Sequence, residues 1–141
     1  MINIPMATST ITYTGQLRTT AVHELSGNTI ITDAPPDNNG RGEAFSPTDL
    51  LATSLGNCML TIMGILANRI EVNIDGTKAE IVKVMASDPR RVAEVHVTFT
   101  MPERSYSSKE KQMLVNAAHT CPVALSLHPD IKQVVNFVWA S

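Results

Sequence analysis

The sequence predicts an α+β fold in which short strands precede and follow one long apolar helix. Two observations carry this prediction. Alternating, Thr- and Val-rich segments bounded by turn residues occur at both ends of the chain. Between them, residues 46–69 have an apolar pattern that continues for several helical turns. We therefore expect an antiparallel meander, a buried central helix and a second group of strands, in this order along the chain.

The first group of strands is predicted at residues 8–14, 17–25 and 29–32. Gly15 and residues 26–28 (Ser-Gly-Asn) supply turn residues between them, which is typical of an antiparallel meander. Residues 33–42 follow with two prolines, two glycines and no apolar period. We interpret this segment as a loop.

The long helix has a clear start signal at Ser46. Ser46 is a suitable N-cap, Pro47 fits the first helical position, and Asp49 is placed to complete a capping box. Apolar residues cover most of the helix circumference, beside a narrow polar stripe that includes Thr53 and Asn57. One sheet covers only one side of a helix, so a second copy of the protein is expected to cover the rest.

Two glycines, Gly56 and Gly64, lower the helix propensity within this segment. We attribute both to the close approach of another backbone.

The C-terminal half predicts a second group of strands and two further helices. Val95, Val97 and Phe99 define the buried face of one strand. The predicted elements are strands at 77–86 and 92–100, a helix capped by Ser107 with Glu110 three residues later and ending near His119, a short helix from Cys121-Pro122, and a strand at 131–138.

Length and charge limit the classes of function. A chain of 141 residues predicts a single domain over residues 1–141. The net charge is −2 and the basic residues are scattered, which argues against nucleic acid as a partner. The N-terminus lacks a signal-peptide pattern, and the apolar stretch 59–67 is too short to span a bilayer. We expect a cytoplasmic protein without a membrane partner.

Cys58 and Cys121 are the only cysteines. In a reducing compartment they are expected to be thiols, metal ligands or a catalytic pair rather than a permanent disulfide. The start of the short helix should favour the thiolate of Cys121. The histidines and cysteines lack the close spacing of a zinc site, so no metal or other cofactor is expected. His119 and Cys121 are two residues apart, which disfavours a Cys–His pair for acyl transfer.

These features together resemble the OsmC/Ohr family, the osmotically inducible protein C and organic hydroperoxide resistance proteins. Residues 45–58 (Phe-Ser-Pro-Thr-Asp-Leu-Leu-Ala-Thr-Ser-Leu-Gly-Asn-Cys) are similar to the family's Pro-x-Glu-Leu-Leu-x-x-x-Leu-Gly-x-Cys pattern, and residues 121–123 (Cys-Pro-Val) match its second cysteine. The resemblance implies an α+β, OsmC-like fold in which two antiparallel β-sheets wrap around central helices in an intertwined homodimer. It also implies a stress-response thiol peroxidase that reduces organic hydroperoxides.

The resemblance further implies roles for individual residues. Cys58 would attack the peroxide and become a sulfenic acid, Cys121 would form a disulfide with it, and an external dithiol, of the lipoyl type, would reduce the pair. Arg18 is the expected activating cation. The family's partner acid for this arginine would fall at Thr48, so Asp49 or Glu43 is expected to take that role, although Asp49 is also explained as a helix cap.

A second interpretation remains open. The chain could be a non-enzymatic OsmC-like protein that binds an apolar ligand or senses the redox state through its thiols. Turnover with an organic hydroperoxide distinguishes the two interpretations.

Overall fold

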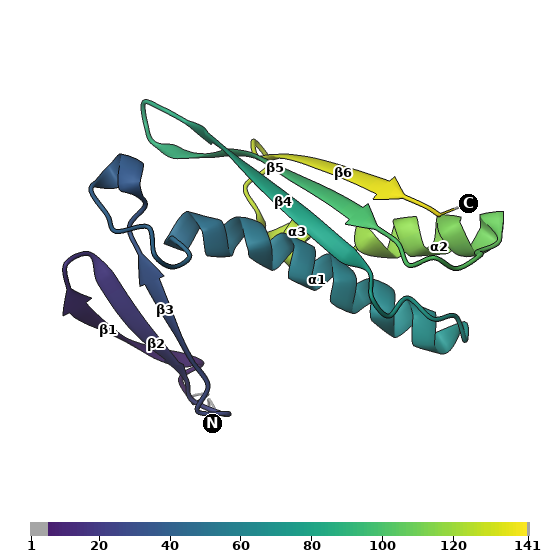
Figure 1. The fold of residues 1–141 in the computed structure, drawn as a ribbon, viewed down its shortest axis with the longest axis horizontal. Helices are drawn as coiled ribbons and strands as arrows, with labels where there is room; N and C mark the ends of the chain where they lie inside the picture. Colours follow the sequence, from purple (N-terminus) through teal and green to yellow (C-terminus); the bar gives the residue numbers. More distant parts are fainter. Residues whose placement is uncertain (1–5, 141) are drawn as a thin grey trace, which may run out of the picture. The chain divides into compact units, whose positions relative to one another are not determined.

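The computed structural model describes residues 6–140. Residues up to Leu50 and residues from Leu51 onward form two compact units, which are described in turn. Figure 1 shows the order of the elements along the chain.

The first unit contains a three-stranded antiparallel sheet in the order β1-β2-β3. The strands are β1 (Ser9–Gly15), β2 (Arg18–His23) and β3 (Thr29–Asp33), which confirms the predicted meander. Within the chain this sheet is thinly covered, since Ile11, Tyr13 and Ile30 are 64%, 63% and 51% exposed. Apolar residues therefore lie on an open sheet surface.

The loop after β3 folds back on itself. A short 3-10 turn, η1 (Pro36–Asn38), is followed by Gly40, whose N–H donates to the Pro35 carbonyl at 2.9 Å. A Cβ at Gly40 would overlap the Ala34 carbonyl, so only glycine permits this close approach. The predicted loop is thus a compact segment held against the end of β3.

Helix α1 (Pro47–Arg69) begins as the sequence predicts. The Asp49 N–H donates to Ser46 Oγ at 3.0 Å, and the Ser46 N–H donates to Asp49 Oδ2 at 2.9 Å. These two bonds form the predicted capping box and satisfy two backbone donors that no helical carbonyl can reach.

The second unit has a sheet of three strands in the order β4-β5-β6. Its strands are β4 (Lys78–Ala86), β5 (Arg91–Thr100) and β6 (Lys132–Val138). The predicted second sheet is present, with the difference that β6 pairs parallel to β5. Parallel neighbours need a long crossover connection, which here contains the helices α2 (Ser108–Ala118) and α3 (Pro122–Ser126).

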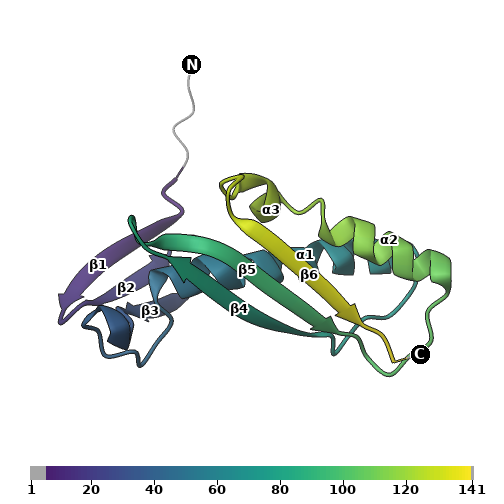
Figure 2. The same cartoon turned by 90° about the horizontal axis from the view of Figure 1, so that it is seen from above.

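The core of the second unit lies between this sheet and the helices. Figures 1 and 2 show α1, α2 and α3 on one face of the sheet. Val95, Val97 and Phe99 are fully buried on that face, as predicted. Helix α1 contributes one buried stripe to this core, made of Ala52, Leu55, Gly56, Met59, Met63 and Ala67.

The opposite side of α1 is open within the chain. Leu51 and Ile65 are 38% and 52% exposed, so burial around the whole circumference is not reached by one copy. A Cβ at Gly56 would meet the Ile81 side chain on β4, whereas a Cβ at Gly64 would meet nothing within 4 Å among the described residues. The expected close backbone approach was therefore wrong for Gly56, where the neighbour is a side chain.

By length and composition alone, α1 would also qualify as a membrane span. This is weak evidence, because the core helix of a folded domain meets the same criterion.

Candidate functional site

Cys58 lies on α1 at the border between the buried stripe and the open side of the helix. Its side chain is half-buried and packs against the core of the second unit. The nearby hydroxyls of Ser54 and Thr61 donate to carbonyls of the same helix, at 2.6 Å to Leu51 and 2.9 Å to Asn57. These hydroxyls are therefore engaged within α1 itself.

Cys121 is held at the start of α3. Its backbone is extended and its Sγ accepts a hydrogen bond from the Ala124 N–H at 3.3 Å, so the thiol itself caps the helix. The side chain is fully buried, among the residues of the core that also contacts Cys58. Both cysteines are free thiols.

The two thiols are neighbours, although they are far apart in the sequence. The Cys58 side chain packs against the core that contains Cys121, close enough to affect the Cys121 thiol electrostatically. Burial raises the pKa of Cys121 above the ordinary cysteine value, more than the Ala124 N–H lowers it, and Cys58 raises it further. The expectation that the helix start favours a Cys121 thiolate was therefore wrong, because loss of hydration outweighs the short helix.

Arg18 belongs to a cluster of charged groups in the first unit. Its guanidinium donates from Nε to Asp33 Oδ1 at 2.7 Å and from Nη2 to Asp33 Oδ2 at 2.8 Å. The carboxylate of Glu43 lies 3.8 Å from Nη2 and its side chain is 66% exposed. The hydrogen bonds from Arg18 lower the pKa of Asp33, whose side chain is only 1% exposed.

The residues proposed from the sequence thus fall into three places. Cys58 and Cys121 meet in the second unit, Arg18 and Glu43 lie together in the first, and Asp49 is engaged in the α1 capping box.

Asp33 was missed. It faces Arg18 across β2 and β3, and the strand register would have shown this pairing once the hairpin was aligned.

Residues 6–140 contain no group of three or more His, Cys, Asp or Glu side chains placed to hold a metal ion. The second unit offers the chemistry of two thiols, one half-buried and one buried, and the first unit separately offers a guanidinium fixed by Asp33.

The chain thus has one thiol on the long helix α1 and the other at the start of the short helix α3, in an α+β fold with two three-stranded sheets. The family model described as OsmC-like protein matches residues 40–135. The chain belongs to this OsmC/Ohr family.

Comparison with solved structures supports this assignment. A protein of Psychrobacter arcticus 273-4, described provisionally as an osmotic stress induced and detoxification response protein, is 56% identical with a TM-score of 0.93, over 98% of this chain and 100% of that one. An organic hydroperoxide resistance protein OsmC from Legionella pneumophila is 15% identical (TM-score 0.72, 95% and 98% covered).

An OsmC-like protein of unknown function from Vibrio cholerae O1 is 13% identical (TM-score 0.78, 96% and 100% covered). The last two share the fold with this chain. The comparison with curated protein sequences gave no match.

Proposed function

We propose that this protein is a thiol-dependent peroxidase that reduces organic hydroperoxides. The observation that carries this proposal is the proximity of a half-buried Cys58 to a fully buried Cys121. A peroxidase of this kind needs one thiol that the substrate can reach and a second, neighbouring thiol that forms a disulfide with it. Membership of a family with hydroperoxide resistance proteins supports the same reaction.

The reaction divides between the two thiols. The Cys58 thiolate attacks the distal oxygen of the hydroperoxide, the O–O bond breaks, and the leaving alkoxide takes a proton to become an alcohol. Cys58 is then a sulfenic acid. The Cys121 sulfur attacks it, a water molecule leaves, and a disulfide forms. An external dithiol, of the lipoyl type, reduces this disulfide and is itself oxidised.

Arg18 is the proposed cation for the Cys58 thiolate. A guanidinium remains charged at every physiological pH and favours a negatively charged sulfur nearby. We assign the helix acid Asp49 to capping, since its carboxylate holds the Ser46 N–H. Glu43 is a second, exposed carboxylate beside Arg18.

We further propose that the protein works as a homodimer. The open side of α1 with Leu51 and Ile65 and the open first sheet with Ile11 and Tyr13 leave large apolar side chains without cover in one chain. A second copy would bury both surfaces. Light scattering at low micromolar concentration should give the mass of a dimer, and a folded monomer would contradict this.

The function is tested by steady-state turnover of the purified protein with cumene hydroperoxide and a dihydrolipoyl donor, beside hydrogen peroxide and glutathione. Cys58→Ser should abolish turnover. Cys121→Ser should allow one reduction and then accumulate the Cys58 sulfenic acid, detected with a dimedone reagent. An absence of turnover in the unmodified protein would instead favour the redox-sensing or ligand-binding interpretation.

A further inference from the structure

A two-pronged ion pair in the first unit joins β2 and β3. Arg18 and Asp33 are direct cross-strand partners, and two N–H bonds of 2.7 and 2.8 Å connect the guanidinium to both carboxylate oxygens. This forked geometry fixes the plane of the guanidinium as well as its position. The Asp33 side chain is 1% exposed, whereas that of Arg18 is 23% exposed.

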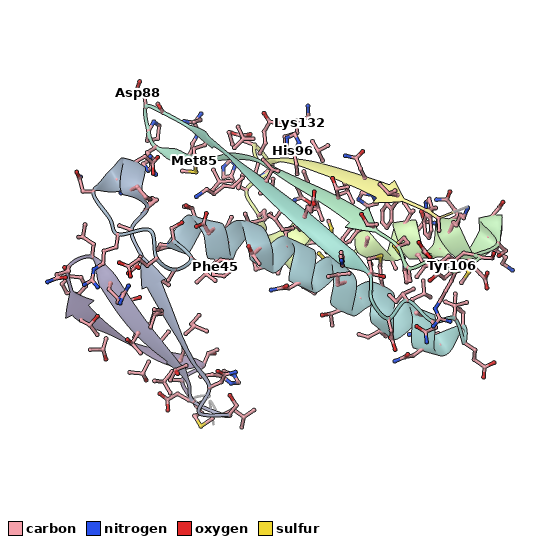
Figure 3. The ribbon with its side chains drawn as sticks, viewed as in Figure 1. Phe45, Met85, Asp88, His96, Tyr106 and Lys132 are labelled. Carbon is pink, nitrogen blue, oxygen red and sulfur yellow. The ribbon has the colours of Figure 1, made fainter. Side chains whose placement is uncertain are left out.

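Asp33 is itself held by the loop that follows β3. The Glu43 N–H donates to Asp33 Oδ2 at 3.1 Å, and the Asp33 N–H donates to the Phe45 carbonyl at 3.1 Å. Figure 3 marks Phe45 on the segment between β3 and α1. Backbone and side chain of Asp33 are thus fixed from two directions, so its carboxylate cannot turn away from Arg18.

The fork leaves one edge of Arg18 available. Nε and Nη2 are used by Asp33 and Glu43, and within residues 6–140 no acceptor is assigned to Nη1. Glu43 is a poor candidate for the anchor, because it is 66% exposed and lies at 3.8 Å. A buried carboxylate on a neighbouring strand holds the arginine more rigidly than an exposed one on a loop.

We infer that Asp33 is the positioning residue for Arg18, fixing the guanidinium on the sheet in the orientation that its proposed role toward the Cys58 thiolate requires. This inference rests on the proposed function. Asp33 touches neither thiol nor substrate in this role and acts through Arg18 alone. Because the hydrogen bonds from Arg18 lower the pKa of Asp33, the pair stays ionised throughout the neutral range.

The test compares Asp33→Asn with Arg18→Ala and with the double variant. Two quantities are measured for each: kcat/KM for cumene hydroperoxide, and the rate of Cys58 alkylation by iodoacetamide between pH 5 and 9 in a Cys121→Ser background. Glu24→Gln is the matched control, since it removes one negative charge from the same unit and its carboxylate pairs with Thr10.

We expect Asp33→Asn to lower both quantities roughly ten- to a hundredfold, as a misplaced catalytic group does. Glu24→Gln should leave them unchanged, and Asp33→Asn should add nothing once Arg18 is alanine. The inference would be overturned if Asp33→Asn lowered both quantities by the same factor in the presence of Arg18 and in the Arg18→Ala background. Such a result would show that Asp33 has a structural role independent of Arg18. Unchanged values in Asp33→Asn, with a loss in Arg18→Ala, would also overturn it and leave the proposed function intact.

A failure of the proposed function has a different signature. In that case the unmodified protein would not turn over hydroperoxide, or Arg18→Ala would change neither quantity, and the inference would fall with it.

A second measurement covers the case in which Asp33→Asn does not fold. The second measurement is hydrogen exchange of arginine side chains by NMR, with the Arg18 Nε–H signal identified by its loss in Arg18→Lys. In the unmodified protein this Nε–H should exchange with solvent at least tenfold more slowly than the Nε–H groups of exposed arginines. Exchange as fast as theirs would overturn the inference.

Discussion

Gly56 offers a quantitative test of how closely α1 lies on the second sheet. A Cβ built at this position would lie 2.6 Å from Cδ1 and 3.6 Å from Cγ1 of Ile81, whereas a Cβ at Gly64 would meet no described atom within 4 Å. Both glycines lie inside the same helix. The variants Gly56→Ala and Gly64→Ala therefore gain the same helix propensity and differ in the contact with Ile81.

The expected magnitudes follow from these distances. Replacing a helical glycine with alanine stabilises by about 1 kcal/mol in each variant. Carbon atoms pack at roughly 3.5 to 4.0 Å, so the Ile81 methyl must move by about 1 Å in Gly56→Ala. A forced rotamer or an overpacked contact costs about 1 to 3 kcal/mol. From the contacts within one chain, Gly64→Ala should thus be about 1 kcal/mol more stable than the unmodified protein, and Gly56→Ala less stable than Gly64→Ala by about 1 to 3 kcal/mol.

Urea unfolding at one fixed protein concentration measures both variants, since association would make stability depend on concentration. The Ile81→Val variant removes Cδ1 and completes a double-mutant cycle. In the Ile81→Val background the difference between the two alanine variants should shrink to about 0.5 kcal/mol or less. If Gly56→Ala is as costly with valine as with isoleucine at position 81, the close contact between α1 and β4 is refuted.

Three further predictions concern the charged pair, the buried thiol and the substrate. Arg18 lowers the pKa of Asp33, so the pair stabilises the fold above the unfolded carboxyl pKa of about 3.9, and this stabilisation is lost as the pH falls through the native pKa of Asp33. An acid titration followed by circular dichroism should therefore show a smaller loss of stability in Asp33→Asn than in the unmodified protein. Identical titration curves would contradict this prediction. Burial raises the pKa of Cys121, so iodoacetamide at pH 8 should modify Cys58 well before Cys121 in the folded protein and both cysteines equally in urea. Peptide mass mapping measures the two modification rates. Equal rates in the folded protein would show that the Cys121 thiol is accessible. Apolar side chains of α1 flank Cys58, namely Leu55, Met59 and Ile62. The value of kcat/KM should therefore rise with hydroperoxide chain length, since four buried methylenes are worth about 3 kcal/mol, or roughly a hundredfold. Equal values for hydrogen peroxide and a long-chain hydroperoxide would reject an apolar path.

The features that could be predicted from the sequence are those set by neighbouring residues. The capping boxes at Ser46 and Ser107 need only residues three positions apart, and both are present as expected. The buried face of β5 follows from the period of two in Val95, Val97 and Phe99. Each of these signals is complete within a few residues, so no tertiary information was needed.

The features that were missed depend on pairing between distant segments. The parallel position of β6 follows from the crossover through α2 and α3, and a single strand pattern does not reveal its partner's direction. The direction of the Cys121 pKa shift likewise depends on how deeply the thiol is buried. A helix-start pattern in the sequence does not contain this information.

The two acids nearest to the proposed chemistry have separate tasks in this chain. The Asp49 carboxylate accepts a hydrogen bond from the Ser46 N–H. This bond fixes where α1 begins and thereby the helical turn on which Cys58 lies. The capping role expected of Asp49 is therefore sufficient to explain its presence, while a buried acid on β3 already occupies Arg18 through both oxygens. A sheet acid opposite the arginine removes the need for a glutamate at Thr48, the position at which the family resemblance placed one. This departure from the family pattern is thus compatible with the proposed reaction, because what the reaction requires is a fixed guanidinium, and Asp33 supplies the carboxylate that fixes it.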